Sequence, residues 1–335
     1  MKVNRAVRPT KRQGEPLDNY ELMTMSMPSA SPKNVVVQVV LRPVNLTDMH
    51  PSRWGSWAHL DLSQVVVGSE GVGVVYEVGE EVTKMKVGQR VIPLTFNRYY
   101  PSGYGLWRDY VEVPEIDLVK VPEEMSDAVA AQFFINPWTA YGLVKRLDVP
   151  KGEYMLQAGA ASTVGRNVIR IAKYYGIKTI NLVRKDEWFQ PLKDQGADYV
   201  INSTTTDVKA KVKEITGGKG VYGALDPVAG ESTMMVASCV RDGGQVLVYG
   251  SLSGTRSVIE LADLRREVAI SYFKVNDFGD DIPIREETAS NVLHLLSNKI
   301  IEPQIRKTYP LEEFREAIKE AERDSRGGKV FLSSY

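Results

Sequence analysis

A glycine-containing turn between an apolar run and an amphipathic segment constrains the fold of this chain more than any other feature. The turn spans residues 157–165 and reads Gln-Ala-Gly-Ala-Ala-Ser-Thr-Val-Gly, after an apolar run at 154–156 and before an amphipathic stretch at 166–175. This order predicts a strand, a tight turn and a helix. Small residues let the N–H groups of a helix approach a pyrophosphate, so the pattern is typical of a dinucleotide-binding unit.

The run after this helix indicates which dinucleotide is bound. Residues 178–183 are β-rich, and they are followed by Arg184 and Lys185 instead of Asp or Glu. An acidic residue there would hydrogen-bond the ribose 2′-hydroxyl of NADH, whereas two cations suit the 2′-phosphate of NADPH. We therefore predict NADPH as the cofactor. The alternative is a Rossmann-like unit without cofactor, in which Arg184 is only solvated.

Length and charge limit the class of protein. The chain has 335 residues, of which 43% are hydrophobic, enough for two sizeable cores. Lys plus Arg and Asp plus Glu number 42 each, so no global field favours nucleic acid or a membrane surface. These values predict two domains and a small-molecule ligand.

Cysteine content and hydropathy indicate the compartment. Cys239 is the only cysteine, which excludes an internal disulfide and the thiolate clusters of structural zinc sites. No apolar run reaches the roughly 18 residues that a membrane helix needs. We expect a soluble cytoplasmic protein, or a mitochondrial one if a transit peptide has been removed.

The periodicity of the chain changes near residue 125. Short β-rich runs dominate before it, and helices alternate with strands after it, which implies a parallel sheet. A last helix and strand look as if they return to the first domain. The prediction is therefore an α/β chain with a β-rich catalytic domain at 1–125 and 275–335 and a Rossmann domain at 126–274. Expected strands are 34–41, 71–78, 90–93, 110–113, 118–121, 154–156, 179–183, 199–201, 223–225, 245–249, 269–273 and 329–332, and expected helices include 126–134 and 311–323.

Four short strings carry a family resemblance. They are Asn136-Pro-Trp-Thr-Ala-Tyr141, Gly105-Leu-Trp-Arg108, Thr179-Ile-Asn-Leu-Val-Arg184 and Tyr249-Gly-Ser-Leu252. With the domain order, they make the chain resemble the medium-chain dehydrogenase/reductase superfamily, in its zinc-free quinone oxidoreductase and mitochondrial-type 2-enoyl thioester reductase branch. The enoyl thioester reductases are the closer match. The resemblance implies a GroES-like domain beside a doubly wound Rossmann domain.

The resemblance also implies that catalytic zinc is lost. Zinc-dependent relatives have a Cys after the third strand and a His in a Gly-His-Glu motif, where this chain reads Asn45-Leu-Thr-Asp48 and Gly68-Ser-Glu70. We expect no metal. Without a Lewis acid, the acceptor carbon must already be activated by conjugation, as in quinones, enones and enoyl thioesters.

Cofactor contacts are implied by the resemblance at matching positions. Asn136 would lie near the nicotinamide ribose, and Lys329 would reach the phosphates unless it is simply a solvated residue. Tyr249 would border the nicotinamide unless it is only strand core. The other implied contacts are Gly159, Ser162, Thr163, Val164 and Gly165 at the pyrophosphate, Arg184 and Lys185 at the 2′-phosphate, and Gly250, Ser251, Leu252, Tyr272, Phe273, Lys274 and Val275 around the nicotinamide.

One loop departs from the enoyl thioester reductases and guides the choice of substrate. Residues 49–59 lack the tyrosine thought to assist protonation there, and they offer instead the donors Trp54, Ser56 and Trp57. Tyr104, near Tyr99 and Tyr100, would replace the missing phenol or form a lid, unless these rings only pack together.

The two tryptophans suit stacking against a flat quinone or aryl enone. The prediction is therefore an NADPH-dependent quinone or enone reductase. A 2-enoyl thioester (CoA or acyl carrier protein) reductase of fatty acid synthesis is the close alternative, and a non-catalytic, crystallin-like NADPH-binding protein the remote one. The resemblance and the β-prone run at 257–261 also predict a homodimer.

Overall fold

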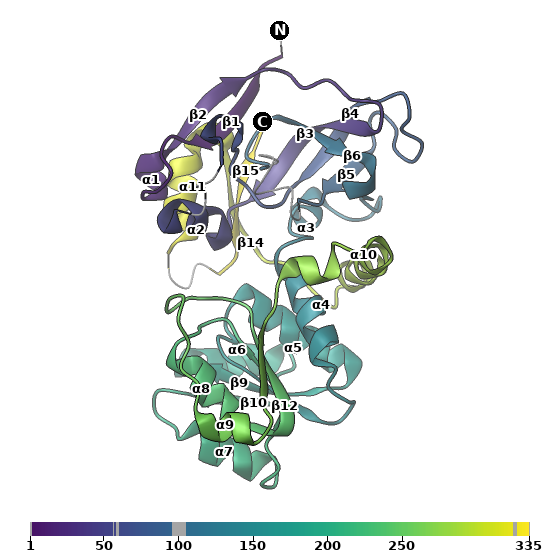
Figure 1. Cartoon of the computed structure of the whole chain (residues 1–335). Coiled ribbons are helices and arrows are strands. Elements are labelled where there is room, and N and C mark those ends of the chain that lie inside the picture. The colour runs from purple at the N-terminus through teal and green to yellow at the C-terminus, as the bar shows by residue number, and fades with distance from the viewer. Residues whose placement is uncertain (1, 56, 58–59, 96–104, 324–326, 335) are drawn as a thin grey trace. The chain divides into compact units, whose positions relative to one another are not determined.

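The chain forms two compact units. Unit 1 comprises Met1–Ile135 and Glu302–Tyr335, and unit 2 comprises Asn136–Ile301 (Figure 1). The units divide at residues 135 and 301, whereas the sequence predicts domain boundaries at 125 and 274. The difference arises because α10 (Ile282–Ser297) packs against α4 (Asn136–Leu147) within unit 2. The computed structural model describes residues 2–55, 57, 60–95, 105–323 and 327–334.

Unit 1 is built on a mixed sheet of seven strands with the order β14-β15-β3-β4-β5-β7, in which β6 also pairs with β3. A separate antiparallel pair, β1 and β2, completes its strands. Val35, Val37 and Val39 alternate along β3 and are fully buried, as period-2 patterning requires. The elements are β1 (Asn4–Pro9), α1 (Pro16–Asn19), β2 (Tyr20–Met25), β3 (Asn34–Pro43), α2 (Leu46–Trp54), β4 (Val72–Val78), β5 (Arg90–Pro93), β6 (Tyr110–Pro114), β7 (Leu118–Lys120), α3 (Asp127–Ala130), β14 (Ile305–Pro310), α11 (Phe314–Ala321) and β15 (Lys329–Ser333).

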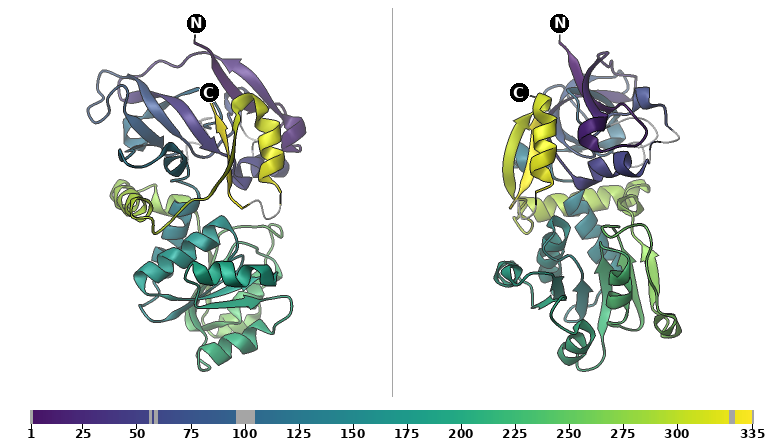
Figure 2. Two further views of the ribbon diagram at one scale, coloured as in Figure 1. Left: turned by 180° about the vertical axis from the view of Figure 1, so that it is seen from behind. Right: turned by 90° about the vertical axis from the view of Figure 1, so that its left-hand side faces the viewer.

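The C-terminal segment returns to the N-terminal part of unit 1, as the sequence predicts. β15 pairs with β3 antiparallel and with β14 parallel. Arg315 of α11 donates from Nη2 to the backbone oxygen of Tyr20 at 2.7 Å, which ties the last helix to β2. Figure 2 shows this yellow segment beside the purple N-terminal strands.

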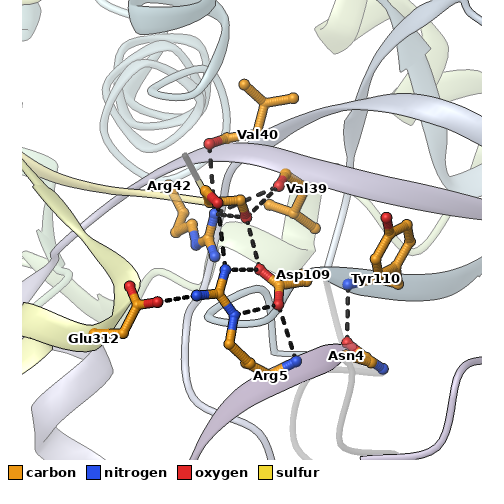
Figure 3. A network of polar contacts seen from close by, with 9 residues as sticks. Asn4, Arg5, Val39, Val40, Arg42, Asp109, Tyr110 and Glu312 are labelled. Atoms are coloured by element: carbon orange, nitrogen blue, oxygen red, sulfur yellow. Dashed lines mark hydrogen bonds and ion pairs between the residues drawn. The ribbon is translucent and has the colours of Figure 1, made fainter. Parts of the chain in front are cut away.

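A partly buried ionic contact joins the two ends of unit 1 (Figure 3). Arg5 of β1 donates from Nε to Asp109 Oδ2 at 2.7 Å and from Nη2 to Asp109 Oδ1 at 3.0 Å, and it also pairs with Glu312. Ser334 Oγ donates to the same carboxylate at 3.0 Å. Burial opposes ionisation of Asp109, but the hydrogen bonds from Arg5 and Ser334 hold its pKa below the ordinary value.

Unit 2 is a parallel sheet of six strands in the order β10-β9-β8-β11-β12-β13. The order reverses at β8 and β11, which creates the switch point where open α/β sheets bind ligands. The elements are α4, β8 (Tyr154–Gln157), α5 (Thr163–Tyr175), β9 (Lys178–Val183), α6 (Phe189–Asp194), β10 (Tyr199–Asn202), α7 (Val208–Ile215), β11 (Val221–Asp226), α8 (Glu231–Ala237), β12 (Val240–Val248), α9 (Leu261–Arg265), β13 (Ala269–Tyr272) and α10.

Helices cover both faces of this sheet. Leu182 belongs to an apolar cluster with residues of α7 and α8, whereas the next residue, Val183, packs with residues of α5 and α6. Successive strand residues point to opposite faces, so the two clusters lie on opposite sides. The doubly wound architecture predicted from the sequence is therefore confirmed.

One expected helix is wrong over most of its length. Residues 126–134 contain only α3, four residues long, capped by Ser126. The N–H groups of Phe134 and Ile135 donate instead to the buried carboxylate of Glu70, at 3.0 and 2.8 Å. At 311–323 the expected helix begins with a 3₁₀ turn and ends at Ala321. Within the described residues, no helix combines the length and apolar character needed to span a bilayer.

Candidate active site

The glycine turn adopts the strand, turn and helix order expected from the sequence. β8 ends at Gln157, and α5 begins at Thr163 with Ser162 as its N-cap. The Gly165 N–H donates to Ser162 Oγ at 3.0 Å. The remaining N–H groups of the first turn lack carbonyl partners within the helix, as at every helix N-terminus, and this favours an anion there.

Two glycines of the turn are required by its geometry. Gly159 has a φ of +61°, and a Cβ on it would lie 2.8 Å from Pro227 Cγ. A Cβ on Gly165 would lie 2.7 Å from the backbone oxygen of Ala160. The turn therefore requires glycine at both positions, because Pro227 and the turn's own backbone occupy the space that a side chain would need.

A buried amide holds the turn against the sheet. Gln157 donates from Nε2 to the backbone oxygen of Gly165 at 2.9 Å and to Asn181 Oδ1 at 2.7 Å. This side chain joins β8, β9 and the start of α5. Because each group is buried, the bonds fix the turn at little entropic cost.

Residues predicted to bind the cofactor lie at the carboxyl edge of the sheet. All six strands are parallel, so the segments after β8, β9, β12 and β13 lie at one edge. Arg184 and Lys185 follow β9 and are exposed, and Lys185 Nζ lies 3.8 Å from Glu187 Oε1. No carboxylate of the described chain forms an ion pair with Arg184. Its guanidinium is therefore available to an anionic ligand.

Tyr249 carries a buried hydroxyl near the turn. This hydroxyl has no hydrogen-bond partner of good geometry among the described residues, although Ser162 lies close enough to affect its pKa. Burial raises the pKa of Tyr249 above its ordinary value, and the charge of Asp226 adds to this. The phenol stays protonated and can donate. A Cβ on the next residue, Gly250, would lie 2.5 Å from the backbone oxygen of Pro227, so only glycine fits.

The other predicted cofactor residues of unit 2 differ in accessibility. Phe273 is buried and packs on Phe278, so its side chain is part of the core. Tyr272 and Lys274 are exposed beside it. Asn136 is buried as the first residue of α4. Thr163 and Val164 are the first residues of α5, Ser251 and Leu252 follow Gly250, and Val275 begins a 3₁₀ turn.

Unit 1 contains a buried polar cluster, here called the Lys329 cluster, made of Asn45, Asp48, Ser69, Glu70 and Lys329. Lys329 Nζ donates to Asn45 Oδ1, and Asn45 Nδ2 donates to Glu70 Oε1 at 2.9 Å. Asp48 accepts from the backbone N–H groups of Asn45 and Ser69, each at 2.8 Å. All five residues are buried. An ammonium group thus lies among the residues at the places where the resemblance puts zinc ligands.

The carboxyl groups of the Lys329 cluster have perturbed acidity. Burial raises the pKa of Asp48 to about 7 although two N–H groups favour its ionised form. Burial also raises the pKa of Glu70, and the charge of Lys329 opposes this. The charge of Lys329 is therefore the main influence that favours the ionised form of Glu70 against its burial. The cofactor contact expected of Lys329 stays a prediction.

The substrate-loop residues are only partly described. Trp54 ends α2, is exposed, and stacks on His50 with ring centroids 4.2 Å apart. Burial and the charge of Arg53 lower the pKa of His50. Trp57 is instead 1% exposed and packs against Tyr20 in the core of unit 1. This packing leaves almost none of the Trp57 side chain exposed, and its stacking on a substrate stays a prediction. Ser56, Tyr99, Tyr100 and Tyr104 lie outside the described residues.

Two family models match the chain, one in each unit. The family model of the alcohol dehydrogenase GroES-like domain matches residues 31–123, and that of the zinc-binding dehydrogenase matches residues 163–297. A mitochondrial enoyl-[acyl-carrier-protein] reductase of Xenopus tropicalis is 30% identical over 93% of this chain and 90% of its own length. The chain belongs to the medium-chain dehydrogenase/reductase superfamily.

Further relatives place the chain in the branch that includes quinone oxidoreductases and enoyl thioester reductases. A mitochondrial enoyl-[acyl-carrier-protein] reductase of Caenorhabditis elegans is 37% identical over 71% of this chain and 67% of its own length. A Bacillus thuringiensis structure, described as an NADPH:quinone reductase, has a TM-score of 0.91, 27% identity and 100% coverage of both chains. This member of the superfamily is thus an oxidoreductase with a GroES-like and a Rossmann-like domain. Its cytoplasmic location stays a prediction.

The local motifs predicted the strand, turn and helix around Gly159 correctly, but sequence reasoning missed the Lys329 cluster as a site. Asn45 and Glu70 were recognised only as replacements of zinc ligands, and Lys329 lies 284 positions from its partner Asn45. The available signal was two acidic residues, Asp48 and Glu70, close to apolar runs such as Val65–Val67. Within the described residues, no group of three or more His, Cys, Asp or Glu side chains is arranged to hold a metal.

Proposed function

We propose that this protein reduces quinones or conjugated enones with NADPH. The observation that carries the proposal is the glycine turn, closed to side chains at Gly159 and Gly165 and followed by an exposed, unpaired Arg184. NADPH bound there supplies a hydride to an acceptor that conjugation has already activated. The coarser conclusion, oxidoreductase activity, comes from the superfamily.

The chain's own residues have binding and orienting roles in this proposal. The N-terminus of α5 with Ser162 would hold the pyrophosphate, and Arg184 with Lys185 would hold the 2′-phosphate. The buried hydroxyl of Tyr249, which lacks a full hydrogen bond, would donate to a group bound at the turn. A quinone needs no dedicated acid, because its reduced anion can take a proton from water.

A turnover comparison tests the substrate class. Consumption of NADPH is followed through its nicotinamide absorbance with phenanthrenequinone and with a trans-2-enoyl-CoA at matched concentrations. We expect fast turnover of the quinone and little of the thioester. Binding of NADPH without turnover of either acceptor would instead support the non-catalytic alternative.

Enoyl thioester reduction is the second candidate. One observation favours it. The relatives from Caenorhabditis elegans and Xenopus tropicalis, 37% and 30% identical, are both named enoyl-[acyl-carrier-protein] reductases. Against it stands the loop at 49–59, which has no tyrosine. Fast thioester turnover in the comparison above would make this the function, and would mean that another donor replaces the phenol.

We also propose a homodimer formed through the segment at 257–264. The expected strand at 257–261 is wrong, because Ser257 makes only an isolated bridge with Gly230 and α9 begins at Leu261. Four apolar side chains nevertheless remain exposed there, namely Val258, Ile259, Leu261 and Leu264. Such a group of exposed apolar residues is typical of an interface. A second copy of the chain would bury them.

A further inference from the structure

A basic cavity of about 550 Å³ lies within unit 2, away from the glycine turn. Val240, the first residue of β12, lines it, and Gly220, directly before β11, also contributes. These are the amino ends of parallel strands, whereas the glycine turn follows the carboxyl end of β8. The two sites are therefore on opposite edges of one sheet. The lining includes residues of α7 and the residues that directly follow α8 and α9, helices that Figure 1 labels near one another.

The lining of the basic cavity carries an excess of positive charge. Five cations contribute to it, and Asp242 is the only carboxylate. Asp242 lies 3.4 Å from Arg266, whose guanidinium also pairs with Asp263 at 2.7 Å. The single carboxylate of the lining, that of Asp242, is therefore already paired with Arg266. The cations left without a counter-charge are Lys209, Lys213, Lys219 and Arg241.

Two of these lysines lie one turn apart on α7. Lys209 and Lys213 have the spacing at which like charges on a helix repel each other. The lysine between them, Lys211, is instead paired with Glu214 at 2.6 Å. The nearby Asp207 carboxylate is engaged with the Ala210 N–H at 3.0 Å as the helix cap. Glu214 thus neutralises Lys211, which does not line the basic cavity. Lys209 and Lys213, which do line it, have no ion-pair partner among the described residues.

The arginines that line the basic cavity are held in place. Arg266 donates from Nη1 to the backbone oxygen of Val240 at 2.6 Å and from Nη2 to that of Ala237 at 3.0 Å. The guanidinium of Arg241 lies 3.7 Å from the centre of the Tyr222 ring. Side chains restrained in this way lose little freedom when an anion binds, so the site is preorganised.

Cys239, the buried thiol of the basic cavity, does not point to redox chemistry. Burial raises its pKa to about 11, so the thiol is protonated at neutral pH and is a poor nucleophile. The features that remain are concavity, a volume suited to a small molecule, and lysines that act as point charges toward phosphate.

We propose that the basic cavity binds a small metabolite through an oligophosphate group. The site is separate from the proposed cofactor site, because it is formed at the other edge of the sheet. An acidic protein is the less suitable partner, since the cations line a hollow and not a broad face. The phosphates could belong to inorganic polyphosphate, to a nucleoside triphosphate or to coenzyme A, which share this chemistry.

Isothermal titration calorimetry with tripolyphosphate tests the proposal. The titration is made with and without saturating NADPH, so that occupancy of the glycine turn is controlled, and is repeated with ATP and with coenzyme A. We expect tripolyphosphate to bind in both conditions. Equal affinities for tripolyphosphate and ATP would identify the phosphates as the whole ligand, and tighter binding of ATP or coenzyme A would identify a nucleotide.

Variants of α7 supply the matched control. Lys209→Gln combined with Lys213→Gln should weaken tripolyphosphate binding about tenfold or more, since the variant removes two charged donors to the phosphates. Lys211→Gln removes the same charge from the same helix outside the basic cavity and should change affinity less than about twofold. NADPH affinity should be unchanged in all variants, which separates this site from the proposed function.

Three outcomes would overturn the proposal. The first is absence of tripolyphosphate binding to the wild-type protein at millimolar concentration. The second is equal weakening by Lys211→Gln, which would mean that the general field of the helix is responsible and not the basic cavity. The third is binding that disappears when NADPH saturates the protein, which would place the anion at the glycine turn. Circular dichroism confirms that the variants are folded.

Discussion

At the scale of single residues, Arg184 is the side chain that we predict to select NADPH over NADH at the glycine turn. It is exposed directly after β9 and forms no ion pair with a described carboxylate. Arg184→Ala should weaken NADPH binding about tenfold or more and NADH binding less than about twofold, because only NADPH carries the 2′-phosphate. Affinities are measured by nicotinamide fluorescence. As a control, Lys178→Ala removes the same charge at the other end of β9 and should change neither affinity. Equal weakening of both dinucleotides by Arg184→Ala would reject the contact between Arg184 and the 2′-phosphate.

Lys329 is the residue on which the buried polar cluster of unit 1 depends. Its charge opposes the burial that raises the pKa of Glu70, in a cluster whose five residues are all buried. Lys329→Met should lower the free energy of unfolding by about 3–5 kcal/mol, because it leaves a buried carboxylate without its counter-charge. Urea denaturation measures this change.

A surface lysine provides the control for that variant. Lys319 pairs with Glu316 at 2.7 Å on exposed side chains of α11, so Lys319→Met should cost less than about 1 kcal/mol. Adding Glu70→Gln to Lys329→Met should restore part of the lost stability. If the double variant were instead less stable than the single one, Glu70 would not be the group that Lys329 neutralises.

At the scale of elements, the turn between β8 and α5 combines a strained backbone with a steric limit. Gly159 has a φ of +61° and room for no Cβ beside Pro227, whereas Gly152, before the same strand, has a φ of +87° with nothing within 4 Å of a Cβ. Both Gly→Ala variants should lose about 1 kcal/mol from the left-handed backbone.

Only Gly159→Ala should also lose cofactor binding, since its methyl group displaces Pro227 and the turn with it. Thermal unfolding and NADPH titration of both variants separate the two effects. Unchanged NADPH affinity in Gly159→Ala would mean that the turn does not contact the dinucleotide.

The elements also show which inferences the sequence permits. The strands and α5 were predictable because their signals are local, namely β-branched runs and small residues at fixed spacing. The helix expected at 126–134 failed because a distant carboxylate, Glu70, takes the N–H groups of Phe134 and Ile135. The burial of Trp57 was not predictable for a similar reason, since the ring contacts Tyr20, which is 37 positions away in the sequence. Contacts between remote segments leave no local pattern to read.

At the scale of the whole molecule, each of the two units contains one of the polar sites described above. Unit 2 contains the glycine turn and the proposed 2′-phosphate contacts, and unit 1 contains the buried Lys329 cluster. Each set is assembled within its own unit by hydrogen bonds that do not depend on the other. Substitutions in one set should therefore affect stability independently of the other.

Assembly is the remaining property at this scale. Val258, Ile259, Leu261 and Leu264 expose apolar surface within a short segment of unit 2, and burial against a second copy would contribute about 25 cal/mol per Å². Light scattering at micromolar concentration should give about twice the chain mass of 37.4 kDa. Ile259→Lys should yield the monomer, because a buried lysine without a partner is unfavourable.

A control substitution at another exposed apolar residue, Val87, tests whether loss of the dimer is specific to the segment at 257–264. Val87 is 64% exposed in unit 1, and Val87→Lys makes a comparable change away from the proposed interface. It should leave the dimer intact. A wild-type protein of monomer mass would reject the interface outright. A dimer that survives Ile259→Lys would place the two-fold contact on another surface, and the exposed apolar residues at 257–264 would then require a different partner.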